Sequence, residues 1–281
     1  MRAAYTRAAI RFGCIPEPGT YEAWGHSART LGGLVHHQAG GAWLRLMETP
    51  QNKRGGKLWF GTELAATVLP PHVPRPALLK VTDWATDEYA YRAELTTYVT
   101  TPTCSNTPDL PRRAEAPTPW WSQLRGALDA VMATPVPTRR EPVISQAYVN
   151  RAIPAFLGAR HIDTTVRRWT LAHGDLQWAN LTAPELTILD WEGFGPAPFG
   201  FDAANLHAYA LPVPDVARQV RCTFSDILGT PDGWLAELVV GASVLQAADR
   251  DPVHARLAPL VRDHTQKLLA VSDLGIPNED S

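Results

Sequence analysis

The chain has 281 residues, of which 45% are hydrophobic and 19% are charged, and its formal net charge is −2. This composition is typical of a soluble globular protein and argues against intrinsic disorder, and the near-neutral charge gives no reason to expect a nucleic-acid partner. Every apolar run is shorter than the ~20 residues of a membrane-spanning helix, and the N-terminus lacks the apolar core of a signal peptide. We therefore expect a cytoplasmic protein with no membrane partner; its oligomeric state is left open, with a monomer favoured.

The first hundred residues alternate between short strand-like runs and helical segments. Residues 1–13 predict a leading helix, and the glycine-punctuated stretch 21–47 predicts three antiparallel strands. Residues 58–69 carry apolar side chains at helical spacing, and two prolines follow them. Residues 77–81 and 89–95 predict two further strands. Together these elements predict a small antiparallel sheet with helices.

The rest of the chain is mostly helical in pattern. Prolines make 100–119 a loop, and the glycines and prolines of 193–202 predict irregular structure there. Asp202 is expected to cap the helix that follows, because an aspartate at that position can accept backbone N–H bonds. Apolar residues at a spacing of about 3.6 predict helices over 120–132, 143–157, 203–210, 213–228, 233–248 and 252–271.

The most informative stretch lies between these helices, at residues 171–192. It reads His173-Gly174-Asp175-Leu176, then Asn180, then Thr-Ile-Leu leading to Asp190. The apolar residues before Asp190 predict a buried strand that delivers its carboxylate to an open site. Four residues separate Asp175 from Asn180.

This order of side chains fits phosphoryl transfer. The reaction needs a carboxylate beside the attacking hydroxyl and oxygen ligands that hold Mg²⁺ against the phosphates. Protein kinases take these groups from H-R-D-x-x-x-x-N and from the aspartate of D-F-G. One carboxylate and one amide are enough for Mg²⁺, which keeps several waters and also binds the phosphates.

The motif His-Gly-Asp-Leu-x-x-x-Asn, followed by Ile-Leu-Asp-Trp-Glu, resembles the aminoglycoside phosphotransferase and choline kinase family. The resemblance implies an α+β, two-lobed protein-kinase-like fold. Residues 1–95 would form a small antiparallel β-sheet N-lobe that binds nucleotide, and residues 96–281 a mostly helical C-lobe that carries the catalytic and acceptor sites. The specific motifs are confined to residues 173–192.

The resemblance also implies roles for the motif residues. Asp175 would be the catalytic residue that orients an acceptor hydroxyl and accepts its proton, while Asn180 and Asp190 would bind Mg²⁺. ATP or GTP would be the phosphoryl donor. His173 is expected to fix the loop by packing and hydrogen bonding rather than to transfer a proton.

In the N-lobe the resemblance implies a nucleotide site with one departure from the family pattern. The turn containing Gly25 and Ser27 would approach the phosphates through its backbone N–H groups. The third strand, where the family has a phosphate-binding lysine, carries Arg45, whose reach and geometry differ from those of lysine. Glu63 on the following helix would pair with Arg45. The alternatives to Arg45 are Lys53, Lys57 and Lys80.

The acceptor is open between three interpretations. The first is a cationic antibiotic, either an aminoglycoside or a cyclic peptide of the capreomycin and viomycin type. The second is a metabolic alcohol such as choline, homoserine or a sugar, and the third is a non-catalytic nucleotide-binding module. Glu192 follows Trp191, directly after Asp190, and would bind a cationic acceptor together with Asp175. The complete metal set and the scarcity of aromatic residues near the C-terminus favour the first interpretation.

Overall fold

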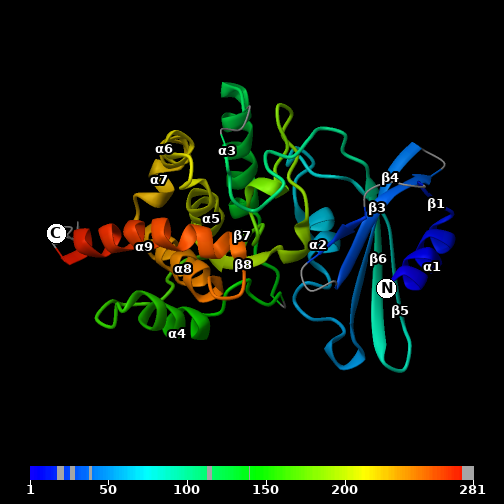
Figure 1. Cartoon of the computed structure of the whole chain (residues 1–281), viewed down its shortest axis with the longest axis horizontal. Coiled ribbons are helices and arrows are strands. Elements are labelled where there is room, and N and C mark those ends of the chain that lie inside the picture. Colours follow the sequence, from blue (N-terminus) through cyan, green and yellow to red (C-terminus); the bar gives the residue numbers. More distant parts are fainter. Residues whose placement is uncertain (18–21, 26–28, 38–39, 113–115, 139, 274–281) are drawn as a thin grey trace. The chain divides into compact units, whose positions relative to one another are not determined.

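The computed structural model describes residues 1–17, 22–25, 29–37, 40–112, 116–138 and 140–273. The chain divides into two compact units (Figure 1). The first unit comprises Met1–Val68 and Pro74–Thr100, and the second comprises Leu69–Val73 and Thr101–Ser281.

The first unit is built on an antiparallel sheet in the order β1-β3-β4-β6-β5, with β2 also paired to β3. The predicted antiparallel sheet is thus confirmed, with three strands in the stretch that carries Arg45. The helices of this unit are α1, Arg2–Phe12, and α2, Gly61–Val68. The strands are β1, Ile15–Pro16; β2, Ala23–Trp24; β3, Thr30–His37; β4, Gly40–Pro50; β5, Leu78–Ala85; and β6, Tyr89–Thr97.

The two faces of this sheet differ in chemistry. Side chains alternate between faces along a strand, so Leu44, Leu46 and Leu95 lie together on one face, where they form a buried core with Ala8 and Phe12 of α1. On the other face Arg45 lies opposite Glu94 in the register of β4 and β6. The sheet therefore has an apolar face that stabilises the unit and a second face that carries charge.

The second unit contains seven helices in its described part and one small sheet. Strand β7, Trp169–Ala172, pairs antiparallel with β8, Gly195–Pro198. The helices are α3, Thr118–Ala133; α4, Gln146–Leu157; α5, Phe201–Ala210; α6, Pro214–Thr223; α7, Ser225–Leu228; α8, Pro231–Ala247; and α9, Pro252–Asp273.

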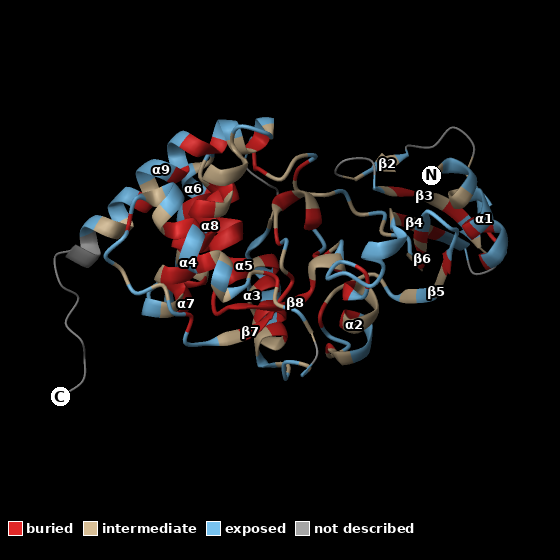
Figure 2. Ribbon diagram, turned by 90° about the horizontal axis from the view of Figure 1, so that it is seen from below, coloured by how far each residue is buried: buried red, intermediate tan, exposed pale blue. Residues whose placement is uncertain are grey.

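Helix α5 lies at the centre of this unit. All ten of its residues are buried, and ten residues of α8 are buried as well (Figure 2). Helix α5 packs against α6, α7, α8 and α9. A helix enclosed on all sides keeps a fixed position, so polar side chains on α5 can hold neighbouring loops in place.

The segment after the motif corrects one prediction. Residues 193–202 were expected to be irregular, but Gly195–Pro198 form β8. Proline is tolerated in this strand because the two-stranded sheet leaves one edge of β8 unpaired with a strand, where a missing N–H costs nothing. The carbonyl of Pro196 accepts the N–H of Val143 at 2.7 Å. The sheet β7-β8 thus closes the loop that carries the motif.

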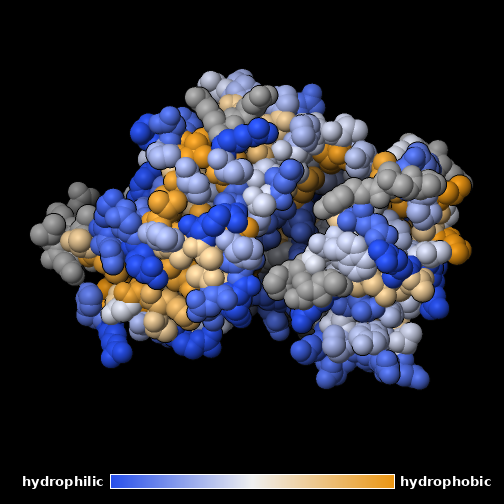
Figure 3. All heavy atoms as spheres, in the orientation of Figure 1, coloured by the Kyte–Doolittle hydropathy of each residue, from blue (hydrophilic) through white to orange (hydrophobic). Residues whose placement is uncertain are grey.

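Within the described residues, every helix is too short or too polar to cross a bilayer. On the face shown in Figure 3, hydrophilic residues are widespread and the hydrophobic ones form smaller groups between them.

Candidate active site

The motif loop begins where β7 ends, and side chains of α5 hydrogen-bond to its backbone. The carboxylate of Asp202, in the first turn of α5, accepts the backbone N–H of His173 at 2.6 Å and that of Gly174 at 3.0 Å. Asp202 is buried, and this burial raises the pKa of its carboxyl group, although the two N–H donors oppose the rise. Asn205, one turn along α5, donates to the carbonyl of Leu176 at 2.9 Å.

This arrangement corrects the expected role of Asp202 as a helix cap. The helix begins at Phe201, and its N-cap is Gly200 in the left-handed conformation, with no side-chain cap bond. Asp202 therefore lies inside the first turn, and its carboxylate points to the motif loop. The sequence carried a signal for this role. Asp202 lies among apolar residues near the start of the helix, and a carboxylate that is buried there needs hydrogen-bond donors.

Gly174 shapes the loop through its backbone. Its φ is +87°, a left-handed conformation that favours glycine. A Cβ atom at this position would lie 2.6 Å from the carbonyl oxygen of Gly193 and 2.9 Å from Val143 Cγ2. Any side chain here would force the loop away from Gly193 and Val143, so the glycine of the motif is required by close packing.

His173 is fully buried and acts as a bridge within the loop. Its Nε2 lies 2.8 Å from the carbonyl of Leu189, and the N–H of Asp175 donates to its Nδ1 at 3.3 Å. These partners assign the Nε2–H tautomer, because Nδ1 must accept. The ring also packs edge-on against Trp191, with centroids 4.7 Å apart. The contacts fit the expected structural role.

A tight hairpin brings the two predicted metal ligands together. Leu181 and Ile188 form a single antiparallel bridge, and the N–H of Leu189 donates to the carbonyl of Asn180 at 2.8 Å. Asp190 follows Leu189 directly, so Asn180 and Asp190 lie at the open end of the same hairpin. The strand predicted before Asp190 is reduced to this single bridge.

Asp190 has an unusual backbone. Its φ is 57° and its ψ is 65°, and among the described residues it is the one non-glycine residue with positive φ. A left-handed aspartate costs energy that the surrounding structure must supply, and such residues concentrate at functional sites. A 3₁₀ turn, Trp191–Gly193, starts immediately after it and turns the chain towards β8.

The carboxylate of Asp175 is electrostatically perturbed. Asp175 is exposed as a residue. Desolvation of its carboxyl group by the surrounding protein and, second, the negative charge of Asp190 raise the pKa of this group to about 6. Asn180 Nδ2 donates to the Asp175 carbonyl at 2.9 Å and lies 3.4 Å from its Oδ2. The side-chain amide of Asn180, a predicted metal ligand, thus contacts Asp175, the predicted catalytic residue.

The two tryptophans of the motif belong to the core. Trp178 is fully buried and Trp191 is 3% exposed. Trp178 stacks on Trp120 of α3, and the indole N–H of Trp191 donates to the carbonyl of Ile188 at 2.7 Å. Both rings therefore pack in the interior of the second unit, next to the motif loop. Glu192 is half-buried in the 3₁₀ turn beside Asp190.

The residues predicted in the first unit form a charged network with an unexpected pairing. Arg92 is 1% exposed, and its Nη2 lies 2.6 Å from Glu63 Oε2. Arg92 also contacts Asp83 at 3.1 Å and Glu94 at 3.0 Å. The pair expected between Glu63 and Arg45 is replaced by this contact, because Arg92 lies on β6 with its guanidinium directed at the first turn of α2.

Arg45 is paired across the sheet. Its Nη1 lies 3.6 Å from Glu94 Oε2, while Glu94 Oε1 receives Arg92. Glu94 therefore joins the two arginines, and sequence reasoning missed both Arg92 and Glu94. Their two-residue spacing could have identified them, because it places both side chains on the same face of the sheet as Arg45.

Three other predicted positions of the first unit have simpler outcomes. Gly25 follows β2, and its N–H donates to the carbonyl of Thr30 at 3.1 Å. A Cβ on Gly25 would overlap the side chain of Thr30, so this contact requires a glycine. Ser27 lies outside the described residues. Lys80 Nζ donates to the carbonyl of Phe12 at 2.9 Å, which ties it to the α1 face and leaves Arg45 as the better candidate.

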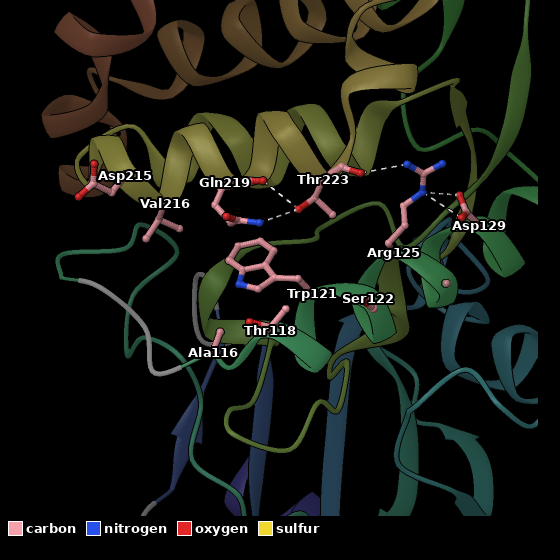
Figure 4. Close-up of a pocket in the computed structure, with 11 residues that line it drawn as sticks. Ala116, Thr118, Trp121, Ser122, Arg125, Asp129, Asp215, Val216, Gln219 and Thr223 are labelled. Atoms are coloured by element: carbon pink, nitrogen blue, oxygen red, sulfur yellow. Dashed lines mark hydrogen bonds and ion pairs between the residues drawn. The ribbon is translucent and has the colours of Figure 1, made fainter.

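A cavity of about 640 Å³ lies elsewhere in the second unit, between α3 and α6 (Figure 4). Trp121, Arg125 and Asp129 of α3 face Gln219 and Thr223 of α6 across it. Arg125 is held by Asp129 and by the carbonyl of Thr223, so much of the charge in this cavity is already paired. The predicted site residues do not line it.

Comparison with solved structures shows which proteins share this fold. The chain is similar to a thermostable mutant of the aminoglycoside phosphotransferase APH(4)-Ia, which was solved with ADP and hygromycin B. The two chains are 12% identical, the match covers 98% of this chain and 100% of that chain, and the TM-score is 0.62. It is similar to a microcompartment-associated aminopropanol kinase, with 12% identity, coverage of 97% and 99%, and a TM-score of 0.56.

A third similar structure is the amicoumacin kinase hAmiN, solved with AMP-PNP, Ca²⁺ and Ami, with 13% identity, coverage of 94% and 93%, and a TM-score of 0.54. No protein-family model and no curated protein sequence matches the chain. The similarity spans nearly the whole length of each of these chains, although few residues are identical. The chain has the kinase-like fold shared by aminoglycoside phosphotransferases and related small-molecule kinases.

Proposed function

We propose that the protein is a phosphotransferase that moves the γ-phosphoryl group of ATP or GTP to a hydroxyl group of a small molecule. One observation carries this proposal: Asp175, Asn180 and Asp190 are joined in one loop whose backbone is fixed by buried hydrogen bonds. The solved structures similar to this chain include one with ADP and hygromycin B, one with AMP-PNP, Ca²⁺ and Ami, and one of a spectinomycin phosphotransferase with ADP and spectinomycin. Their fold makes the same reaction class the natural candidate here.

The residues fit Mg²⁺ as the metal. Asn180 uses its amide nitrogen on Asp175, and in the described part of the chain its Oδ1 accepts no hydrogen bond. Asp190 lies at the same open end of the hairpin as Asn180 and is exposed. Hard oxygen donors of this kind are the ligands Mg²⁺ prefers, and a site with two of them relies on phosphates and waters for the rest. Bound Mg²⁺ would neutralise phosphate charge during transfer.

The chain's own residues would divide the remaining work. Asp175 would orient the acceptor hydroxyl and take its proton, as a carboxylate within hydrogen-bond reach of that hydroxyl can do. Asp202 and His173 would hold the loop in position without touching the substrate. Arg45 would bind the phosphates, and Glu94 orients its guanidinium.

The acceptor that best fits the site is a cationic antibiotic, of the aminoglycoside or capreomycin and viomycin type. Glu192 and Asp175 add negative charge beside the hairpin, which would attract ammonium groups. A site for choline needs several aromatic faces. In the described part of α8 and α9 the aromatic ring is that of Trp234, and its indole N–H donates to the carbonyl of Leu268 at 3.1 Å. A neutral metabolic alcohol remains the alternative.

A kinase assay tests the proposal. The purified protein is incubated with ATP or GTP, with and without Mg²⁺, across a panel of aminoglycosides, capreomycin, viomycin, choline, homoserine and sugars, and phosphorylated products are identified by mass spectrometry. We expect turnover that requires Mg²⁺ and a cationic antibiotic. Turnover with a metabolic alcohol alone would support the alternative, and tight nucleotide binding with no turnover would support a non-catalytic module.

A further inference from the structure

Three helices of the second unit bring two imidazoles and a carboxylate together away from the motif loop. His207 lies on α5, Glu237 on α8 and His264 on α9. One potential ligand atom from each lies within 4.8 Å of the other two. His264 Nε2 is 2.8 Å from Glu237 Oε1, and His207 Nδ1 is 3.3 Å from the same oxygen. The two rings meet edge-on with centroids 4.8 Å apart.

The hydrogen bonding of Glu237 is unbalanced. Its Oε1 faces both histidines and also receives Arg221 Nη1 at 2.6 Å. Its Oε2 is buried and has no hydrogen-bond partner among the described residues. A carboxylate that is 3% exposed normally has partners on both oxygens, because an unsatisfied buried acceptor costs about 1–3 kcal/mol. The cluster as it stands therefore places three donors on one oxygen and none on the other.

We propose that His207, Glu237 and His264 form a binding site for a divalent transition metal of the Zn²⁺ type. Two imidazole nitrogens and one carboxylate oxygen are a ligand set that suits Zn²⁺, with a water as the fourth ligand. Tetrahedral Zn²⁺ places its ligand atoms about 3.3 Å apart, so the observed spacings need only small side-chain movements. Metal on Oε1 moves Arg221 to Oε2, which gives every buried polar atom of Glu237 a partner.

An ion can reach the cluster from solvent. The side chains of His264 and Arg221 are 20% and 39% exposed, which gives an ion a route from solvent.

The site differs from the Mg²⁺ site of the proposed reaction in both ligand chemistry and position. It contains nitrogen ligands, and its members come from α5, α8 and α9 rather than from the motif loop. Metal bound here would cross-link three helices, including the helix whose Asp202 holds the loop. Its expected effect is therefore on stability, and its test does not depend on whether the protein is a kinase.

The experiment uses the full chain, freed of metal by a chelator, and titrates it with Co²⁺ and Zn²⁺ without nucleotide. We expect one equivalent of Co²⁺ to bind with the visible absorption of four- or five-coordinate nitrogen and oxygen ligation, Zn²⁺ to displace it, and the Tm to rise with Zn²⁺. His264→Gln should raise the Kd for Zn²⁺ by about 100-fold or more, because even changes outside the ligand shell cost 10–100-fold. His254→Gln, on the same helix and equally exposed, is the matched control and should leave the Kd unchanged.

Two further variants separate the proposal from its alternatives. Arg221→Gln removes a positive charge that opposes metal, so it should keep or strengthen Zn²⁺ binding while lowering the Tm of the metal-free protein. Asp190→Asn should leave Zn²⁺ binding unchanged. Absence of the Co²⁺ absorption in the wild-type protein would overturn the proposal and leave a buried ion-pair cluster. Binding that is lost in Asp190→Asn but kept in His264→Gln would assign the metal to the motif loop and overturn it equally.

Discussion

Asp202 on α5 accepts the backbone N–H of His173 at 2.6 Å, across a separation of 29 residues in the chain. With its second oxygen it accepts the N–H of Gly174. The loop that carries Asp175 is therefore fixed by a buried carboxylate on the most enclosed helix of its unit. This contact links the packing of the helical unit to the position of the proposed catalytic group.

The first prediction follows from this contact. Asp202→Asn should destabilise the fold by about 1–3 kcal/mol and lower kcat, because the two N–H groups bond to different carboxylate oxygens and one of them would face the amide NH₂ instead. Thermal unfolding and steady-state kinetics measure the two effects. Asp215→Asn is the matched control, since Asp215 lies in the first turn of α6 but is exposed. Equal, small effects of the two substitutions would show that Asp202 does not position the loop.

The second prediction concerns the glycine of the motif. Gly174→Ala should destabilise the protein by about 2–5 kcal/mol, because it combines left-handed strain with an overlap against the Gly193 carbonyl. Gly158 has a similar φ of +72°, and a Cβ there meets nothing within 4 Å. Gly158→Ala should therefore cost about 1–2 kcal/mol. Denaturant unfolding of both variants separates overlap from backbone strain, and equal costs would contradict the packing argument.

Much of the fold was accessible from the sequence because the pattern is local. Apolar spacing located α3 at 120–132 against the observed Thr118–Ala133, and α8 at 233–248 against Pro231–Ala247. The α+β organisation with an antiparallel sheet is confirmed. Strand β8 was missed because its two prolines argue against a strand, and only its pairing with β7 makes them tolerable.

The site was harder to predict because its supports are distant in sequence. The residues Asp175, Asn180 and Asp190 could be named from their spacing, and the structure joins them through one hairpin. The contact from Asp202 and the pairing of Glu63 with Arg92 depend on tertiary packing and strand register, which single-sequence patterns do not contain. The roles of Asp175, Asn180 and Asp190 in phosphoryl transfer remain predictions.

The third prediction concerns Arg45. If it binds the phosphates, Arg45→Ala should lower kcat/KM for the nucleotide by about 100-fold, because losing a charged donor at developing phosphate charge costs this much. Lys53→Ala and Lys57→Ala, on the exposed segment before α2, should have little effect. Arg92→Ala should instead lower the Tm, since it leaves three carboxylates without their buried partner. A larger kinetic effect of Lys53 or Lys57 would show that the phosphate ligand is misassigned.

The fourth prediction tests the charge of the acceptor. Glu192→Gln should raise the KM for a cationic acceptor by a few-fold to about tenfold with kcat preserved, because it removes an attraction present in both ground and transition states. The wild-type KM should also rise with ionic strength beyond about 0.15 M, where charges are screened within ~8 Å. A KM that is insensitive to both changes would argue for a neutral acceptor.

The most direct test of the account compares transfer with binding in Asp175→Asn. The substitution removes the proposed base but keeps the shape of the side chain and leaves Asn180 and Asp190 in place. We predict that Mg²⁺-nucleotide affinity, measured by calorimetry, stays within a few-fold of wild type, while phosphorylation of the acceptor falls by about 10²–10⁴-fold. Phosphorylation at the wild-type rate in Asp175→Asn would contradict the assignment of Asp175 as the residue that accepts the proton.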